Sequence, residues 1–177
     1  YWHNFLMKKI FFIIFFLTFS TNIFAQDKIV YLDVNRLLNE SEAGKYLNSE
    51  LNKINNSNIE EFKKIENTIK SEEEKILKQK NILKTEEFNS KVDELRDKYK
   101  SYQDFKNNKN EEINKIRNDA GSKILKIVNE ILSDYSTDKE ISLIIEKKNI
   151  VIGKTHLDVT EDILKLLNKK IKKIEIN

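Results

Sequence analysis

Apolar residues recur at spacings of three and four through most of the middle of the chain, and this pattern constrains the fold more than any other feature. The first series covers residues 43–76 and the second covers residues 88–131. Such spacing puts the apolar side chains on one narrow stripe of an α-helix, while Lys, Glu and Asn cover the rest. The sequence therefore predicts two long helices, each with a single apolar seam, and Ser41 is the expected N-cap of the first.

A short break over residues 81–85 separates the two series, and Thr85 followed by Glu86 and Glu87 is typical of a helix N-terminus. The chain has only three glycines and no proline in 177 residues, which leaves little material for sharp turns elsewhere. Two long amphipathic helices joined by a short break predict an antiparallel hairpin. At about 40 residues per arm and 1.5 Å rise, it would project roughly 60 Å. We expect the following residues to pack the seam and to be available to a binding partner: Phe62, Ile65, Ile69, Phe88, Val92, Leu95, Tyr99 and Tyr102.

Segments rich in β-branched residues lie on both sides of this hairpin. Residues 28–34 read KIVYLDV and predict a strand buried on both faces, and residues 140–146 and 149–153 predict two more strands joined as a β-hairpin. Residues 159–167 predict a short helix over one sheet face. The basic tail from Lys169 onward is expected to fray.

These elements predict an α+β fold that is mostly α, with a small body of three short strands and a C-terminal helix. The long antiparallel hairpin, residues 41–135, is inserted between the first and second strands, and residues 26–40 and 136–177 form the body. A core of about 60 residues is marginal, so we expect the body to self-associate. The expected sheet and subunit contacts are Ile29, Tyr31, Leu143, Ile145 and Val151.

Residues 1–25 have the features of a secretory signal peptide. Lys8 and Lys9 form a basic start, residues 10–19 are apolar, and a small residue, Ala25, ends the segment. The apolar stretch is shorter than the about 20 residues that span a bilayer, so we expect cleavage near Ala25 rather than a membrane anchor. Residues 1–6, upstream of Met7, are interpreted as a misassigned start.

The composition of the rest of the chain does not favour catalysis or nucleic-acid binding. Without Lys8 and Lys9, 30 basic residues face 29 acidic ones, so the basic excess expected of a nucleic-acid binder is missing. The chain has no cysteine, and His156 is the only histidine after the predicted signal peptide. We expect no catalytic, cofactor or metal site, and a protein that is not an enzyme.

Three segments resemble the Skp or OmpH-like family of periplasmic chaperones, in the same order along the chain. They are residues 28–45 (KIVYLDVNRLLNESEAGK), residues 82–88 (ILKTEEF), and the closing ISLIIEKKNIVIG and LDVTEDILKLLN within residues 141–168. The resemblance implies a homotrimer in the periplasm of a Gram-negative bacterium, with three hairpins projecting as tentacles around a cavity. It implies an ATP-independent holdase for unfolded outer-membrane β-barrel proteins, with the membrane surface or the outer-membrane assembly machinery as further candidate partners.

A second interpretation comes from a different class of protein. A non-enzymatic coiled-coil protein of the cell envelope could use the hairpin as a spacer or as an adaptor that docks on another envelope protein. Such adaptors usually add compact domains with many Gly and Pro turns, which this chain lacks. An adaptor should also have a tighter and more regular seam.

Overall fold

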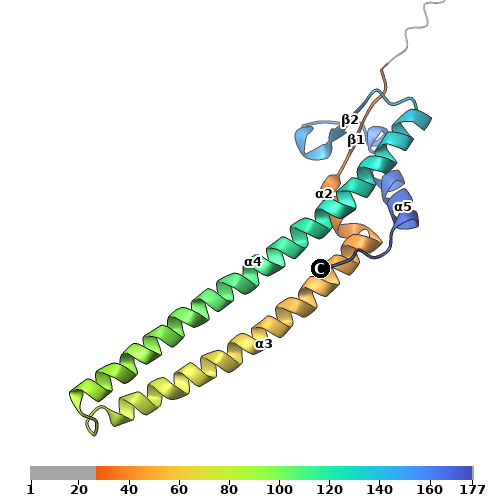
Figure 1. Cartoon of the computed structure of the whole chain (residues 1–177). Helices are drawn as coiled ribbons and strands as arrows, with labels where there is room; N and C mark the ends of the chain where they lie inside the picture. The colour runs from red at the N-terminus through yellow and green to blue at the C-terminus, as the bar shows by residue number, and fades with distance from the viewer. Residues whose placement is uncertain (1–26, 177) are drawn as a thin grey trace, which may run out of the picture.

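The computed structural model describes residues 27–176 and shows a small body from which one long helical hairpin projects (Figure 1). The predicted signal peptide, residues 1–25, lies outside the described residues. The elements in chain order are β1 (Ile29–Leu32), α2 (Val34–Glu40), α3 (Glu42–Gln79), α4 (Thr85–Asp138), β2 (Leu143–Glu146), the short 3₁₀ turns η1 (Lys147–Asn149) and η2 (Thr155–Leu157), and α5 (Thr160–Lys170).

The predicted hairpin is confirmed, and its first helix begins where the sequence indicates. The buried hydroxyl of Ser41 accepts a hydrogen bond of 3.0 Å from the backbone N–H of Gly44 and so caps α3. A Cβ at Gly44 would lie 1.9 Å from the carbonyl oxygen of Leu38, so only glycine fits where α2 turns into α3. The expected Thr85 cap is wrong, because the extended Lys84 is the N-cap of α4 and Thr85 is already helical.

Within residues 27–176 the sheet contains two strands, not three, and they are parallel. Ile29 pairs with Leu143 and Leu32 with Glu146, so the helical hairpin is the long crossover that a parallel pair requires. The chain reverses after α4 at Glu140, whose φ of 53° is left-handed, and β2 can then run in the same direction as β1.

The predicted third strand at residues 149–153 is wrong, and so is the β-hairpin that would contain it. These residues form the end of η1 and a bend, and the side chains of Val151 and Ile152 are 100% and 92% exposed. The segment finds no partner strand within residues 27–176; a single bridge from Tyr31 to Asp158 occupies the other side of β1. The α+β class with a small sheet and an inserted hairpin is confirmed.

The hydrophobic core lies where the body meets the base of the hairpin. It joins β1, α2 and α5 to the body ends of α3 and α4, and its most deeply buried apolar members are Leu37, Ala43, Ile124, Val128, Ile163 and Leu167. The expectation that the tail frays is wrong, because Ile174 belongs to this core and Ile171 and Ile176 pack against it. Three isoleucines supply apolar surface that the lysine-rich composition of the tail conceals.

Packing becomes thinner toward the tip of the arm. On α3 the only buried residues beyond Leu51 are Asn58 and Ile69, and on the facing half of α4 they are Tyr102 and Ile113. The arm is therefore two helices held by a narrow seam with intermittent burial, and most of its surface is solvated. None of the helices within residues 27–176 has the length and apolarity to cross a membrane.

Candidate functional site

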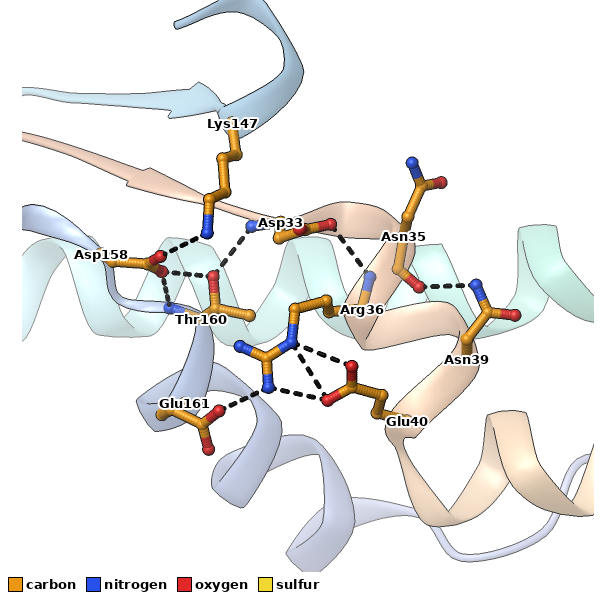
Figure 2. Close-up of polar contacts among 9 residues, drawn as sticks. All are labelled: Asp33, Asn35, Arg36, Asn39, Glu40, Lys147, Asp158, Thr160 and Glu161. Carbon is orange, nitrogen blue, oxygen red and sulfur yellow. Dashed lines mark hydrogen bonds and ion pairs between the residues drawn. The ribbon is translucent and has the colours of Figure 1, made fainter. Parts of the chain in front are cut away.

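A polar cluster near the root of the arm joins the end of β1 and the start of α2 to η1 and α5 (Figure 2). The backbone N–H of Asp33 donates to the Thr160 hydroxyl at 2.9 Å, and that hydroxyl donates to the Asp158 carboxylate. Asp158 also accepts from the Thr160 backbone N–H and pairs with Lys147, each at 3.0 Å. Burial opposes the charge of Asp158, but these hydrogen bonds and the Lys147 ammonium hold the pKa of its carboxyl below its usual value.

Beside this cluster, Arg36 connects α2 to α5. Its guanidinium lies 2.7 Å from Glu40, one turn along α2, and 2.6 Å from Glu161 at the start of α5 (Figure 2). The hydrogen bond from Arg36 lowers the pKa of the Glu40 carboxyl, and both carboxylates raise the pKa of Arg36. These groups are solvent-exposed, so they mainly orient the two helices.

An open groove lies between α3 and α4 in the half of the arm nearer the tip. The volume of the groove is about 530 Å³, and most of its solvent-accessible lining is apolar. The lining residues from α3 are Lys64, Ile65, Thr68, Ile69 and Glu72, and those from α4 are Asp97, Lys98, Ser101, Tyr102 and Phe105. We call this surface the arm groove.

Aromatic rings form the end of the arm groove nearer the body. Phe62 meets Tyr102 and Phe105 edge to face, with ring centroids 6.2 and 5.8 Å apart, and Lys106 Nζ lies 5.2 Å from the Tyr102 centroid. The Tyr102 hydroxyl donates to Glu66, and burial, followed by this hydrogen bond, raises the pKa of Tyr102 to about 12. These rings are held in place and present an apolar wall to the groove.

Charges of both signs flank the arm groove. Lys98 of α4 bridges to Glu72 of α3 at 2.6 Å on its tipward side. Asp97 and Lys64 add one charge of each sign to the lining. Such a surface can hold apolar side chains by burial while tolerating polar neighbours of either charge, because neither sign dominates.

The seam residues named from the sequence do not all enter the arm groove. Ile65, Ile69 and Tyr102 line it and Phe62 packs beside it, whereas Tyr99 is 43% exposed. The three seam residues nearest the tip, Phe88, Val92 and Leu95, are half-buried. Their contact with a partner stays a prediction.

The sequence-based list missed groove residues whose place depends on the opposite helix. Phe105 follows Tyr102 by three positions, so helical spacing was a usable signal for it. Ser101 and Thr68 are polar and carry no seam signal. Their position in the groove follows from the register in which α3 meets α4.

A second apolar surface lies on the body. Ile29 and Leu143 are 44% and 50% exposed, and Val151 and Ile152 protrude almost completely into solvent. Ile29 and Ile152 also line one cavity of about 630 Å³. We call these four residues the body patch.

The remaining predicted subunit contacts have different environments. Tyr31 is buried and its hydroxyl donates to the carbonyl of Lys154 at 3.3 Å, while Ile145 is half-buried. Gly153 allows this approach, since a Cβ there would lie 2.8 Å from the Tyr31 ring. Within residues 27–176 no group of three or more His, Cys, Asp or Glu side chains is placed to hold a metal ion.

A family model and a solved structure both resemble this chain. The family model for outer membrane protein (OmpH-like) matches residues 28–167. No curated protein sequence matches the chain significantly. Among solved structures, a candidate outer membrane chaperone (OmpH-like) from Caulobacter crescentus CB15 aligns over 86% of this chain and 90% of its own, with a TM-score of 0.75 and 15% identity.

The two comparisons agree with each other and with the sequence resemblance. At 15% identity the structural likeness shows the fold, and the family match independently covers most of the chain, including both strands and both long helices. The chain therefore belongs to the OmpH-like family, as its opening, break and closing segments predict.

Proposed function

We propose that this protein is a periplasmic, ATP-independent holdase that binds unfolded outer-membrane β-barrel proteins and prevents their aggregation before membrane insertion. The observation that carries the proposal is the arm groove on the long projecting arm. The groove is open to solvent, mostly apolar and about 530 Å³ in volume. Membership in the OmpH-like family supports a chaperone role.

The chemistry of the arm groove suits a chain that has not folded. Unfolded proteins expose apolar side chains, and burying these against Ile65, Ile69 and Phe105 removes apolar surface from water. Contacts of this kind are individually weak and non-directional, so a client, meaning the unfolded protein that is held, can be bound without a fixed conformation and then released. Binding by burial alone requires no nucleotide.

The body patch is the basis for a homotrimer in this proposal. Four exposed apolar residues gather beside a sheet of only two strands, whose outer edge at β2 is unpaired within residues 27–176. An exposed edge with apolar neighbours pairs readily with another copy of the chain. A closed ring of copies would set several arms around one space. The expected signal peptide would direct each copy to the periplasm, where cleavage near Ala25 would release it.

The experiment uses the chain from Gln26 onward, purified and mixed with a urea-unfolded outer-membrane β-barrel protein diluted into buffer without nucleotide. Native mass spectrometry measures the assembly, and light scattering measures client aggregation. We expect a trimer that takes up one client and keeps it from scattering light. A monomer that leaves client aggregation unchanged would refute the holdase, and stable docking on a folded envelope protein alone would favour the adaptor.

A further inference from the structure

The C-terminal tail, residues 171–176, leaves the body and lies over the base of the hairpin. Figure 1 shows the chain ending against the body-proximal part of the two long helices. Lys173 Nζ lies 5.5 Å from the centroid of the Tyr46 ring on α3, and Lys123 of α4 donates to the carbonyl of Glu175 at 3.1 Å. The tail therefore touches both helices of the arm.

The tail is held by apolar contacts, since Ile174 belongs to the hydrophobic core and Ile171 and Ile176 pack against it, and not by backbone hydrogen bonds. Its backbone makes no hydrogen bond to the backbone of another described residue after Ile171, which bonds to Leu167 at the end of α5. Lys172 pairs with Glu42 at 3.6 Å through two exposed side chains, which contributes little. Only Ile174 is buried, at 8% exposure. The tail can thus leave its seat without breaking a helix or a strand.

The tail also fits its seat incompletely. A cavity of about 340 Å³ remains between it and α4, lined by Ile116, Ala120 and Ile176 together with Asp119, Ser122, Lys123 and Glu175. This pocket is partly open to solvent, and its volume lies within the range of pockets that hold ligands, about 300–1,000 Å³. The pocket beside the tail and α4 therefore has room for an additional side chain.

We propose that the tail covers a docking strip for an extended polypeptide segment in which apolar and polar residues alternate, and that a client segment displaces the tail from it. The tail itself shows the chemistry that fits, because Ile174, Glu175 and Ile176 read apolar, charged, apolar with the period of a β-strand. Strands of membrane β-barrels carry this alternation together with aromatic girdle residues, which could fill the cavity.

This inference rests on the proposed function for the identity of the client, but not for the existence of the strip. The strip is formed by Tyr46 of α3 and by Ile116 and Ala120 of α4, near the body, whereas the arm groove lies nearer the tip. A client would therefore find a covered site at the root of the arm and an open one farther out. The tail blocks the strip while it is bound there. The apparent affinity of the strip for a client therefore equals its intrinsic affinity multiplied by the fraction of molecules whose tail has left the strip.

The test compares full-length chains from Gln26 onward that differ in how firmly the tail is seated. Ile174→Asp weakens the seat, and Ser122→Cys with Glu175→Cys, joined by a short bismaleimide, locks it; the chain has no other cysteine. Ile59→Asp is the matched control, because Ile59 is an exposed apolar residue of α3 away from the tail. Circular dichroism checks that each variant is folded.

Two readouts are measured on these chains. The first is affinity for an unfolded β-barrel client, expected to rise at least about threefold in Ile174→Asp and to fall in the locked chain. The second is binding of a fluorescent peptide with the sequence of residues 170–177, expected for Ile174→Asp but not for the locked chain. If no chain captures the client, the peptide readout alone decides the strip: peptide binding to Ile174→Asp but not to the locked chain would refute the proposed holdase and support the strip. Client capture with equal affinity by Ile174→Asp and the locked chain, or no peptide binding to folded Ile174→Asp, would overturn the inference.

Discussion

The backbone N–H of Asp33 donates a hydrogen bond of 2.9 Å to the Thr160 hydroxyl, although the two residues are 127 positions apart in the sequence. Asp33 is the N-cap of α2, and Thr160 is the first residue of α5. This bond therefore joins the end of β1, where the chain leaves the sheet, to the start of α5, the last helix of the body. Thr160 is fully buried, so water cannot replace its hydroxyl.

Replacement of Thr160 should destabilise the body. In Thr160→Val the shape of the side chain is kept, but the partly buried Asp33 N–H and Asp158 carboxylate each lose a hydrogen-bond partner. We expect a loss of about 1–3 kcal/mol in the free energy of unfolding. Urea unfolding followed by circular dichroism measures it, with Thr155→Val on the exposed η2 turn as the control. Equal midpoints for the two variants would show that the bond contributes nothing.

The stabilising charge of Asp158 should be lost in acid. Its carboxyl has a folded-state pKa below the ordinary 3.8, so the ionised form favours the folded chain. The contribution is complete at neutral pH and declines as the pH falls below about 4, where the unfolded chain takes up a proton first.

The variant Asp158→Asn tests this pH dependence. It should be clearly less stable than the unmodified chain at pH 7, and the difference should shrink as the pH falls below about 4 and the Asp158 carboxylate takes up a proton. Urea midpoints measured at several pH values give the difference directly. A gap between the two chains that did not change as the pH fell below about 4 would contradict the assigned role of the carboxylate.

Asn58 should be a weak point of the arm. It lies on the α3 seam at 6% exposure, and its Nδ2 has no hydrogen-bond partner among the described residues. Since an unpaired buried amide costs about 1–3 kcal/mol, Asn58→Leu should stabilise the arm and raise the thermal midpoint by about 2–4 °C per kcal/mol. Asn56→Leu, at a solvent-exposed position of α3, is the control. A lower midpoint for Asn58→Leu would mean that the amide is satisfied in the assembled protein.

The body patch should decide the assembly state. The double change Val151→Asp and Ile152→Asp places two charges on side chains that are 100% and 92% exposed, so it should leave the single chain folded and prevent association. Analytical ultracentrifugation at micromolar concentration should show monomers. Ile82→Asp, at an 80% exposed residue of the arm tip, should leave the assembly intact. An unchanged assembly in the double variant would exclude the patch as the interface.

The hairpin could be predicted from sequence because its determinants are local. Spacings of three and four define each helix without knowledge of the other, and Ser41 caps α3 through a residue only three positions away. The small body around β1 could be inferred because its strand needs partners. Each of these inferences depends on short stretches of chain.

Features that depend on distant contacts were predicted poorly. Residues 149–153 have the composition of a strand, but no other strand within the described chain lies beside them, and Val151 is fully exposed. The tail is basic and was expected to fray, yet Ile174 packs in the core at the base of the hairpin. The arm groove depends on the register that brings Tyr102 to Glu66, 36 positions away, and helical periodicity within one segment cannot supply this register.

Site-specific cross-linking tests most directly whether the arm groove holds an unfolded chain. The sequence has no cysteine, so Ser101→Cys in the groove and Ser71→Cys, on α3 outside its lining, can each carry a single benzophenone. Each labelled chain is mixed with a urea-unfolded outer-membrane β-barrel protein, irradiated and analysed for adducts. We predict that the client cross-links to position 101 with several times the yield at position 71. Equal yields, or adducts only at position 71, would contradict the groove as the binding surface.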